Sequence, residues 1–314
     1  MPDLTAIAID LGGSHAACAI VRGNAILASR SLPADRTSGF APLLPVLKET
    51  IFELLQLVHV DRVDCAGVAL GFCGVVSPRD KRVLATNDKF DDATRLDLSA
   101  WFEDAFGLPF LMENDARLAL LGEHRFGAAR GTRDAVMITL GTGIGGAALL
   151  DGRLLQSQHG LAGAIGGHMP VVLNGRLCSC GNRGCGDAEA STASLPRIYR
   201  ELAGEGAGSL TGKTFGFAEL FDAIKDGDKS ALATLEHCLQ VWSALTVALI
   251  HAYDPEVVVY GGSVLKRADE ILPRLQEYVD MHAWTSGRKV PLRCAALGSD
   301  AALLGAIPLM EYSL

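Results

Sequence analysis

The stretch Val136–Leu150, VMITLGTGIGGAALL, decides the fold because its pattern occurs twice in the chain. Near the start, Ile9–Ser14 reads IDLGGS and aligns with Ile138–Gly143, which reads ITLGTG. In each copy an apolar run leads into a glycine-rich turn and a second apolar run follows, which predicts a β-hairpin. Backbone N–H groups in such a turn can face an anion. The repeat therefore predicts two related α/β halves.

Two halves whose glycine turns face each other would hold a polyphosphate between them. We therefore expect the duplicated actin- and hexokinase-like (ribonuclease H-like) fold, an α/β architecture of two domains with a cleft between them. The small first domain would span residues 1–113 and be completed by a C-terminal helix at about 301–314. Residues 114–300 would form the larger domain. Asp10, at the end of the first apolar run, is placed to hold Mg²⁺, usually through water.

Two other nucleotide-binding motifs do not fit this sequence. Residues 141–146 match G-x-G-x-x-G, but a dinucleotide site requires a helix directly after the glycines. Residues 147–152 read instead as a short apolar run and a turn. The chain also contains no G-x-x-x-x-G-K-[ST] loop, so we expect neither a Rossmann nor a Walker-type site.

Four potential zinc ligands lie close together in the chain: His168, Cys178, Cys180 and Cys185. Three thiolates and one imidazole fill all four positions of a tetrahedral Zn²⁺ and leave none for a catalytic water. The set therefore predicts a structural metal site. Gly181 and Gly184 flank the turn between the last two cysteines, where glycine allows backbone angles closed to other residues. A disulfide or a chance group of buried thiols is the alternative.

Composition narrows the classes of function. The chain has 314 residues, enough for two domains, and 49% of them are hydrophobic. Its net charge of −8 argues against nucleic acid, whose binding proteins carry basic patches. The most apolar stretch, Val241–Ile250, contains Ser243 and Thr246, so we expect no membrane span. The start lacks a secretory signal, and scattered cysteines favour a reducing compartment. We expect a cytoplasmic protein.

The cysteine stretch resembles the signature of the ROK family of sugar kinases and related repressors. It reads G-H, then C-x-C-G-x-x-G-C, with an acidic residue two positions later and Ala-Ser at 190–191. The resemblance implies that the four ligands bind zinc and that His168 also contacts a sugar. It further implies that Asp187 binds sugar hydroxyls, although the family usually has glutamate at this position.

Other segments extend the resemblance. Glu113-Asn114-Asp115-Ala116 is similar to the catalytic segment of the family, which implies that Asp115 is the catalytic base and that it and Asn114 contact the sugar. An aspartate at a helix start is otherwise most often a cap. Asn87 matches a sugar-binding asparagine, and Lys89 is a further candidate contact or part of a solvated loop. The implied nucleotide-binding residues are Asp10, Gly12, Gly13, Ser14, Gly141, Thr142, Gly143, Gly261 and Gly262.

One motif departs from the family. The family reads G-E-x-G-H before the cysteines, whereas Gly163–His168 reads GAIGGH. Depending on the alignment, Ala164 or Ile165 stands where the glutamate is expected, and neither is acidic. The loss predicts a changed sugar preference.

The resemblance implies an ATP-dependent kinase that phosphorylates a hydroxyl of a hexose or a similar sugar. It would use ATP, Mg²⁺ and structural Zn²⁺, would bind a sugar and a nucleotide but neither nucleic acid nor membrane, and would form a homodimer. Polyphosphate in place of ATP is the alternative phosphoryl donor. A sugar-responsive repressor would need a DNA-binding domain ahead of Asp10, where few residues stand. A sugar-binding protein with weak or no catalysis is the other alternative, motivated by the missing glutamate.

Overall fold

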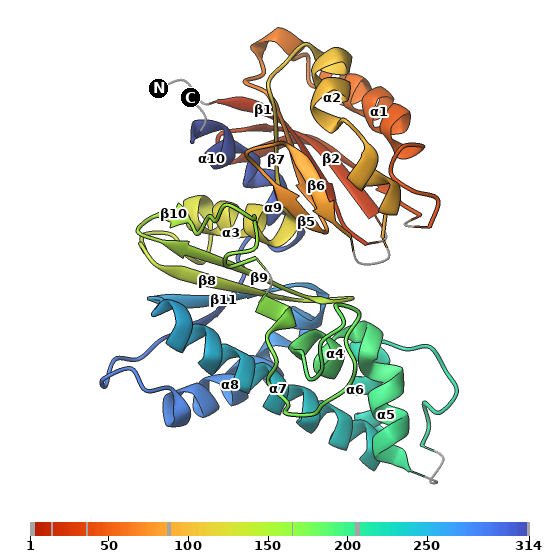
Figure 1. Ribbon diagram of the computed structural model, residues 1–314, viewed down its shortest axis with the longest axis vertical. Coiled ribbons are helices and arrows are strands. Elements are labelled where there is room, and N and C mark those ends of the chain that lie inside the picture. Colours follow the sequence, from red (N-terminus) through yellow and green to blue (C-terminus); the bar gives the residue numbers. More distant parts are fainter. Residues whose placement is uncertain are drawn as a thin grey trace. The chain divides into compact units, whose positions relative to one another are not determined.

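The computed structural model describes residues 4–13, 15–35, 37–86, 89–164, 166–204 and 208–312. The chain divides into two compact units (Figure 1). Unit 1 consists of Met1–Thr132, Arg153–Ala164 and Ala295–Leu314, and unit 2 consists of Arg133–Gly152 and Ile165–Cys294.

The sheet of unit 1 has the strand order β3-β2-β1-β4-β7. β1 pairs antiparallel with β2, as the glycine-rich hairpin predicts, and pairs parallel with β4, which is parallel to β7. The strands of this unit are β1 (Thr5–Leu11), β2 (His15–Arg22), β3 (Ala25–Pro33), β4 (Val68–Phe72) and β7 (Phe110–Asn114), with a small separate hairpin of β5 (Val75–Ser77) and β6 (Arg82–Ala85).

Both faces of this sheet are covered, which explains why β1 is apolar from Ala6 to Ile9. Ile7 and Ile9 point to the core under α1 (Leu43–Leu57) and α2 (Leu98–Phe106), together with a group of phenylalanines. The alternate residues Ala6 and Ala8 face α9 (Ala301–Leu304) and α10 (Ala306–Glu311) on the other side (Figure 1). Small side chains on that face let the C-terminal helices pack closely.

Helix α3 (Asp115–Phe126) packs against α9 and α10 and so belongs to unit 1. Two glycines make the close packing possible. A Cβ on Gly122 would lie 2.1 Å from the Ala301 carbonyl oxygen, and one on Gly305 would lie 2.0 Å from the Leu118 carbonyl oxygen. Unit 1 therefore extends past residue 113, where the sequence analysis places the boundary. The C-terminal helical segment also consists of two short helices that meet at Gly305.

The sheet of unit 2 has the order β10-β9-β8-β11-β12, which repeats the order of the first sheet strand for strand. β8 pairs antiparallel with β9 and parallel with β11. A strand rather than a helix follows the second glycine turn, as expected. The strands are β8 (Ala135–Leu140), β9 (Ile144–Leu150), β10 (Arg153–Leu154), β11 (Val257–Gly261) and β12 (Leu292–Cys294). The predicted duplication is confirmed.

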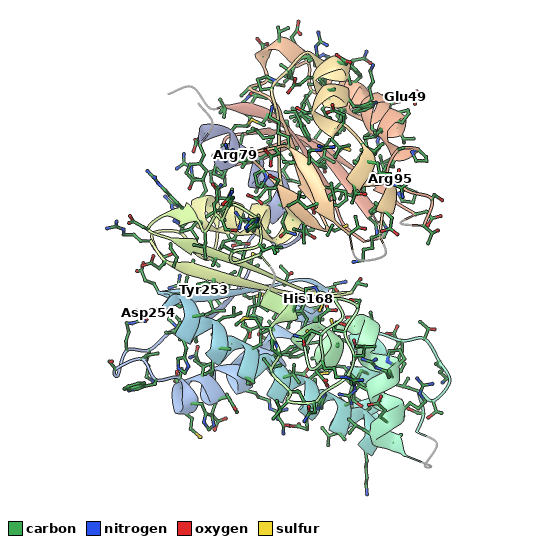
Figure 2. The ribbon with its side chains drawn as sticks, in the orientation of Figure 1. Glu49, Arg79, Arg95, His168, Tyr253 and Asp254 are labelled. Carbon is green, nitrogen blue, oxygen red and sulfur yellow. The ribbon has the colours of Figure 1, made fainter. Side chains whose placement is uncertain are left out.

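The long helix α7 (Lys229–Tyr253) forms the centre of the helical layer of unit 2 and contacts α4, α5, α6 and α8. Asp228 caps its start, and it ends before Asp254, which has a φ of +46° (Figure 2). By length and composition alone α7 could cross a membrane, but 61% of its most apolar window is buried, which is also usual for a core helix. The other helices are α4 (Gly186–Ala190), α5 (Leu195–Ala203), α6 (Phe217–Lys225) and α8 (Ala268–His282).

Short 3-10 turns connect these elements. They are η1 (Arg62–Asp64), η2 (Asp91–Arg95), η3 (Gly166–His168), η4 (Thr192–Ser194), η5 (Ser263–Arg267) and η6 (Gly298–Asp300).

Candidate functional site

Two aspartates meet at the carboxyl edge of the sheet of unit 1. Asp10 pairs with Gly71 on the neighbouring strand, and Asp115 follows the end of the next strand. A Cβ on Gly71 would lie 3.3 Å from Asp10 Oδ1 and 3.6 Å from Asp115 Cα. The bare glycine therefore leaves room for the Asp10 carboxyl group and for the backbone at Asp115.

The environment of both carboxyl groups disfavours their charge. Burial raises the pKa of Asp10 to about 7, and the Asp115 carboxylate adds to this shift. Burial also raises the pKa of Asp115, against the opposing effects of the Ala116 N–H group and the Lys89 ammonium. Among the described residues, Asp10 Oδ1 has no hydrogen-bond partner although it is buried. A buried carboxylate oxygen without a partner fits a hard cation such as Mg²⁺.

Asn114, and not Asp115, is the cap of α3. Its Oδ1 accepts from the N–H groups of Ala116 and Arg117, at 3.1 and 3.3 Å, and its Nδ2 donates to the Gly74 carbonyl at 3.1 Å. Asp115 is the first residue of the helix, and its Oδ1 also accepts from Ala116 N at 2.8 Å. The cap thus fixes Asp115 at the positive end of the helix dipole.

The first glycine turn lies in the same unit. The end of the Lys89 side chain passes over it, because Nζ lies 3.1 Å from the position that a Cβ on Gly13 would have. Gly12 precedes Gly13 at the end of β1. Ser14 and Asn87, the other sequence-predicted residues near this turn, lie outside the described residues.

The second glycine turn is held by the segment after the zinc-ligand candidates. Three hydrogen bonds tie the two together: from Ile144 N to Asp187 Oδ1 (2.7 Å), from Thr192 N to Gly141 O (3.0 Å) and from Ala193 N to Thr142 O (3.1 Å). A Cβ on Gly143 would lie 2.9 Å from the same Asp187 oxygen. One oxygen of Asp187, a sequence-predicted sugar ligand, is therefore engaged by the turn.

The third glycine turn packs beside the second. Gly262 has a φ of +94°, and a Cβ on it would lie 2.1 Å from the carbonyl oxygen of Leu140. Only glycine fits there. The structure therefore brings Gly261 and Gly262 next to Thr139 and Leu140, directly before the second glycine turn.

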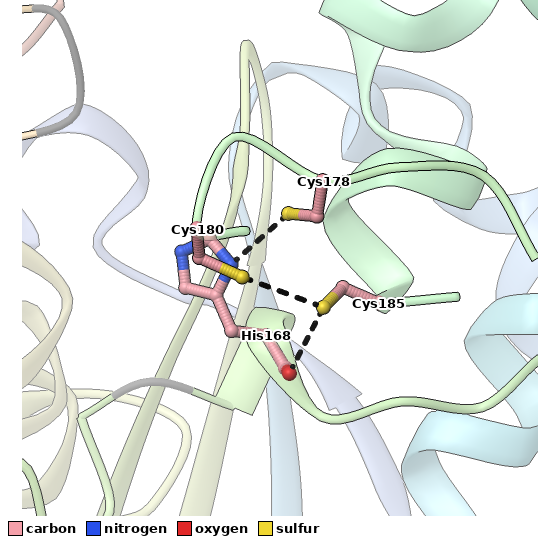
Figure 3. Close-up of side chains that lie close together, drawn as sticks. All are labelled: His168, Cys178, Cys180 and Cys185. Atoms are coloured by element: carbon pink, nitrogen blue, oxygen red, sulfur yellow. Dashed lines mark hydrogen bonds between the residues drawn. The ribbon is translucent and has the colours of Figure 1, made fainter. Parts of the chain in front are cut away.

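The four zinc-ligand candidates converge in unit 2 (Figure 3). Their donor atoms all lie within 4.8 Å of one another. Cys180 Sγ and Cys185 Sγ are 3.7 Å apart, close to the separation of about 3.8 Å that tetrahedral zinc–thiolate bonds require. Cys178 Sγ lies 3.4 Å from His168 Nδ1, against about 3.6 Å for a shared zinc. The donor set and spacing fit Zn²⁺, and the cysteines are free rather than paired in disulfides.

Backbone geometry explains why the loop closes on one point. Gly181 and Gly184 have φ angles of +87° and +71°, as expected from the sequence, and a Cβ on Gly184 would lie 1.8 Å from the Val172 carbonyl oxygen. Isolated bridges pair Pro170 with Cys185 and Leu177 with Arg183. The side chain of His168 comes from η3 (Figure 2).

Glu189 is a buried residue of this loop that the sequence analysis did not identify. Its side chain is fully buried, accepts from the backbone N–H and the guanidinium of Arg176, and lies 3.4 Å from His237 Nε2. It therefore fixes the chain two residues before Cys178. Sequence offered no signal for it, since Arg176 and His237 are remote from it in the chain.

A second unidentified element is the buried ion pair of Glu113 and Arg117. Arg117 Nε lies 2.8 Å from Glu113 Oε1, and Arg117 Nη1 donates to the carbonyl groups of Leu155 and Ala162 at 2.7 and 2.9 Å. The pair ties the segment before Gly163 to the helix that begins with Asp115. The i,i+4 spacing of opposite charges was a signal that could have revealed it.

The chain is similar to known sugar kinases over nearly its whole length. A profile of the ROK family matches residues 6–312. The chain is 32% identical to a glucokinase of Thermotoga maritima, covering 99% of this chain and 98% of the relative. It is also 32% identical to an N-acetylmannosamine kinase of Citrobacter koseri, covering 98% and 99%.

Solved structures of ROK sugar kinases have a similar fold. A ROK hexokinase from Thermus thermophilus has a TM-score of 0.81 at 28% identity, covering 98% of each chain. A ROK glucokinase from Streptomyces griseus, in complex with glucose and AMPPNP, has a TM-score of 0.79 at 27% identity, covering 98% of this chain and 99% of that one. The hexokinase-like fold expected from the glycine turns is confirmed.

Proposed function

Because this chain belongs to the ROK family, we propose that it is an ATP-dependent kinase that phosphorylates a hydroxyl of a hexose or a similar sugar. The observation that carries the proposal is the pair of half-buried aspartates, Asp10 and Asp115, beside Gly71. Perturbed carboxyl groups at the edge of a sheet are typical of functional sites. The glucokinase and N-acetylmannosamine kinase relatives support the same reaction class.

Asp115 is proposed as the general base. It would accept the proton of the sugar hydroxyl as the hydroxyl oxygen attacks the terminal phosphorus of the donor and the bond to ADP breaks. A pKa raised by burial suits this role, since it makes the carboxylate a stronger base. Asn114 would keep the carboxylate in place through the helix cap.

Asp10 would hold Mg²⁺, and the glycine turns would face the phosphates with backbone N–H groups. Bound Mg²⁺ supplies charge neutralisation at the phosphate oxygens. We propose that His168, Cys178, Cys180 and Cys185 hold Zn²⁺, which leaves Nε2 of His168 for the sugar because Nδ1 faces the metal position.

Asn87, Asn114 and Asp187 are proposed as further sugar contacts. The amide of Asn114 already makes hydrogen bonds at both ends, so a sugar contact would replace one of them. Asp187 has one oxygen on Ile144 N, which leaves the other oxygen for a sugar hydroxyl.

The test is a coupled assay of ADP release over hexoses, ketoses and N-acetylhexosamines. We expect turnover with at least one sugar, and a loss of about 10²- to 10⁴-fold in Asp115→Ala with the fold and zinc content retained. Asp97→Asn is the matched control, because Asp97 is an exposed aspartate that caps α2 of the same unit, and asparagine also caps. Near-normal turnover of Asp115→Ala would refute the assignment of the base.

A second candidate is a kinase-like protein that binds sugar with weak or no catalysis. The engaged carboxylate of Asp187 and the absence of an acidic residue at 164 and 165 favour it. In that case a sugar would raise the melting temperature while neither ATP nor polyphosphate gave a phosphorylated product.

A further inference from the structure

We infer that Lys89 binds the terminal phosphate of the nucleotide and neutralises its charge during transfer, an inference that rests on the proposed kinase activity. This assigns Lys89 to phosphate binding rather than to sugar binding. Two observations from unit 1 place it there.

The first observation is the path of the Lys89 side chain. Its Nζ, Cε and Cδ atoms lie 3.1, 3.3 and 3.6 Å from the position that a Cβ on Gly13 would have. The charged end is thus the part nearest to the glycine turn. A side chain at position 13 would displace it, so the glycine here provides space for the ammonium. An ammonium above a turn of backbone N–H groups makes a site for an anion.

The second observation is the charge around Lys89. In the part of the chain that the structure describes, Lys89 has no hydrogen bond or ion pair, although its side chain is half-buried. Lys81, in the preceding turn, is paired with Glu103 at 3.0 Å. A half-buried ammonium that is not directly paired with a carboxylate favours an anionic ligand, because burial without a hydrogen-bond partner costs free energy.

The reacting carboxylate lies within the electric field of this ammonium. Burial raises the pKa of Asp115 and the Lys89 charge opposes the shift. Burial also raises the pKa of Cys73 to about 12, with Asp115 adding to this shift and Lys89 opposing it. Lys89 therefore serves both the phosphate turn and the proposed base. Since the chain has no Walker-type loop, it also lacks the lysine that such a loop provides.

The experiment compares three variants with the wild type. Lys89→Met removes the charge and keeps the length, and Lys89→Arg restores a charge. Lys81→Met is the matched control, because Lys81 is also a half-buried lysine of unit 1 but is paired with Glu103. Steady-state kinetics gives kcat and both KM values. Calorimetry with Mg²⁺ and no sugar gives the affinities for AMPPNP and ADP, and circular dichroism and melting temperature check folding.

For Lys89→Met we expect kcat to fall about 100-fold and AMPPNP affinity about 10-fold, since a charge-assisted bond to phosphate is lost. We expect ADP affinity and the sugar KM to change by less than about 3-fold, because ADP lacks the terminal phosphate. Lys89→Arg should regain part of the AMPPNP affinity. Lys81→Met should match the wild type.

Other results would overturn the inference. A raised sugar KM with unchanged kcat and AMPPNP affinity would assign Lys89 to the sugar, and equal losses for AMPPNP and ADP would assign it to the inner phosphates or to structure. The proposed function fails separately, if the wild type releases no ADP with any sugar. In that event the ratio of AMPPNP to ADP affinity in Lys89→Met still decides the inference.

Discussion

The two sheets share a strand order but place different chemistry at the same point of it. In unit 1, Asp10 on the first strand pairs with Gly71, and in unit 2, Thr139 on the equivalent strand pairs with Gly261. One position holds a buried carboxyl group and the other a hydroxyl. The duplicated backbone therefore supplies two glycine turns, whereas Asp10 and Asp115, the two carboxyl groups with raised pKa values, both belong to unit 1.

The turns also differ in what supports them. The turn of unit 1 lies under the side chain of Lys89. The turn of unit 2 is bonded to Asp187 and to residues 192–193, and Asp187 lies on α4, which begins directly after Cys185. The difference teaches that the same backbone motif can be tied by hydrogen bonds to a neighbouring segment in one half of the chain and lie under a charged side chain in the other.

The largest expected effect is that of the metal loop on unit 2. Cys180→Ala should lower the melting temperature by roughly 10 °C and weaken sugar binding together. Structural zinc contributes about 10 to 16 kcal/mol in small domains, and even a third of this is several kcal/mol. Differential scanning calorimetry, zinc content and hydrogen exchange resolved by unit would measure the change.

Cys65→Ala is the matched control, since Cys65 is a buried thiol of unit 1. Exchange should increase in residues 141–144 and 168–193 in Cys180→Ala and remain low there in the control. Full stability and activity of a metal-free protein would contradict the zinc assignment.

The next effect concerns Asp10, whose equivalent position in unit 2 is occupied by Thr139. The folded-state pKa of Asp10, about 7, exceeds its ordinary value of 3.8, so the folded state holds the proton more tightly than the unfolded state. The contribution of Asp10 to stability therefore falls as pH rises from about 4 to about 7 and is constant above. In Asp10→Asn this loss, about 4 kcal/mol at most, should disappear.

Urea unfolding in the absence of Mg²⁺, at several pH values from 4 to 8, would measure it. The difference in the free energy of unfolding between variant and wild type is compared across pH, because a cost of the buried amide that does not depend on pH then cancels. Thr139→Val, at the equivalent point of unit 2, should show no such pH dependence. A difference for Asp10→Asn that stayed the same from pH 4 to pH 8 would break the comparison between the units.

The smallest effect concerns the sugar. Without an acidic residue in the motif at 163–168, we expect kcat/KM for glucose to be lower by about 10-fold or more than for a sugar altered near carbon 1, as for one lost hydrogen bond. Ala164→Glu or Ile165→Glu should raise glucose activity and identify the correct alignment. High glucose activity in the wild type would refute this expectation. Ile165 itself lies outside the described residues.

Local sequence patterns were enough to predict much of the secondary structure and of the candidate site. The hairpins and the glycine turns follow from periodicity and turn chemistry, and the zinc-ligand candidates follow from their spacing. The packing of α3 on the C-terminal helices did not, because it depends on contacts of Gly122 with residues about 180 positions away. The position of the Lys89 side chain over Gly13 could not be predicted either, because the two residues are far apart in the sequence.

The face of β1 that carries Ala6 and Ala8 has a consequence for synthesis on the ribosome. It is covered by α9 and α10, which are made after all of unit 2. At a translation rate of about 5 to 20 residues per second, the interval from β1 to α10 is roughly 15 to 60 s. Unit 2 can therefore complete its sheet while the first sheet still exposes an apolar face, which makes the nascent N-terminal half a substrate for chaperones until the last helices emerge.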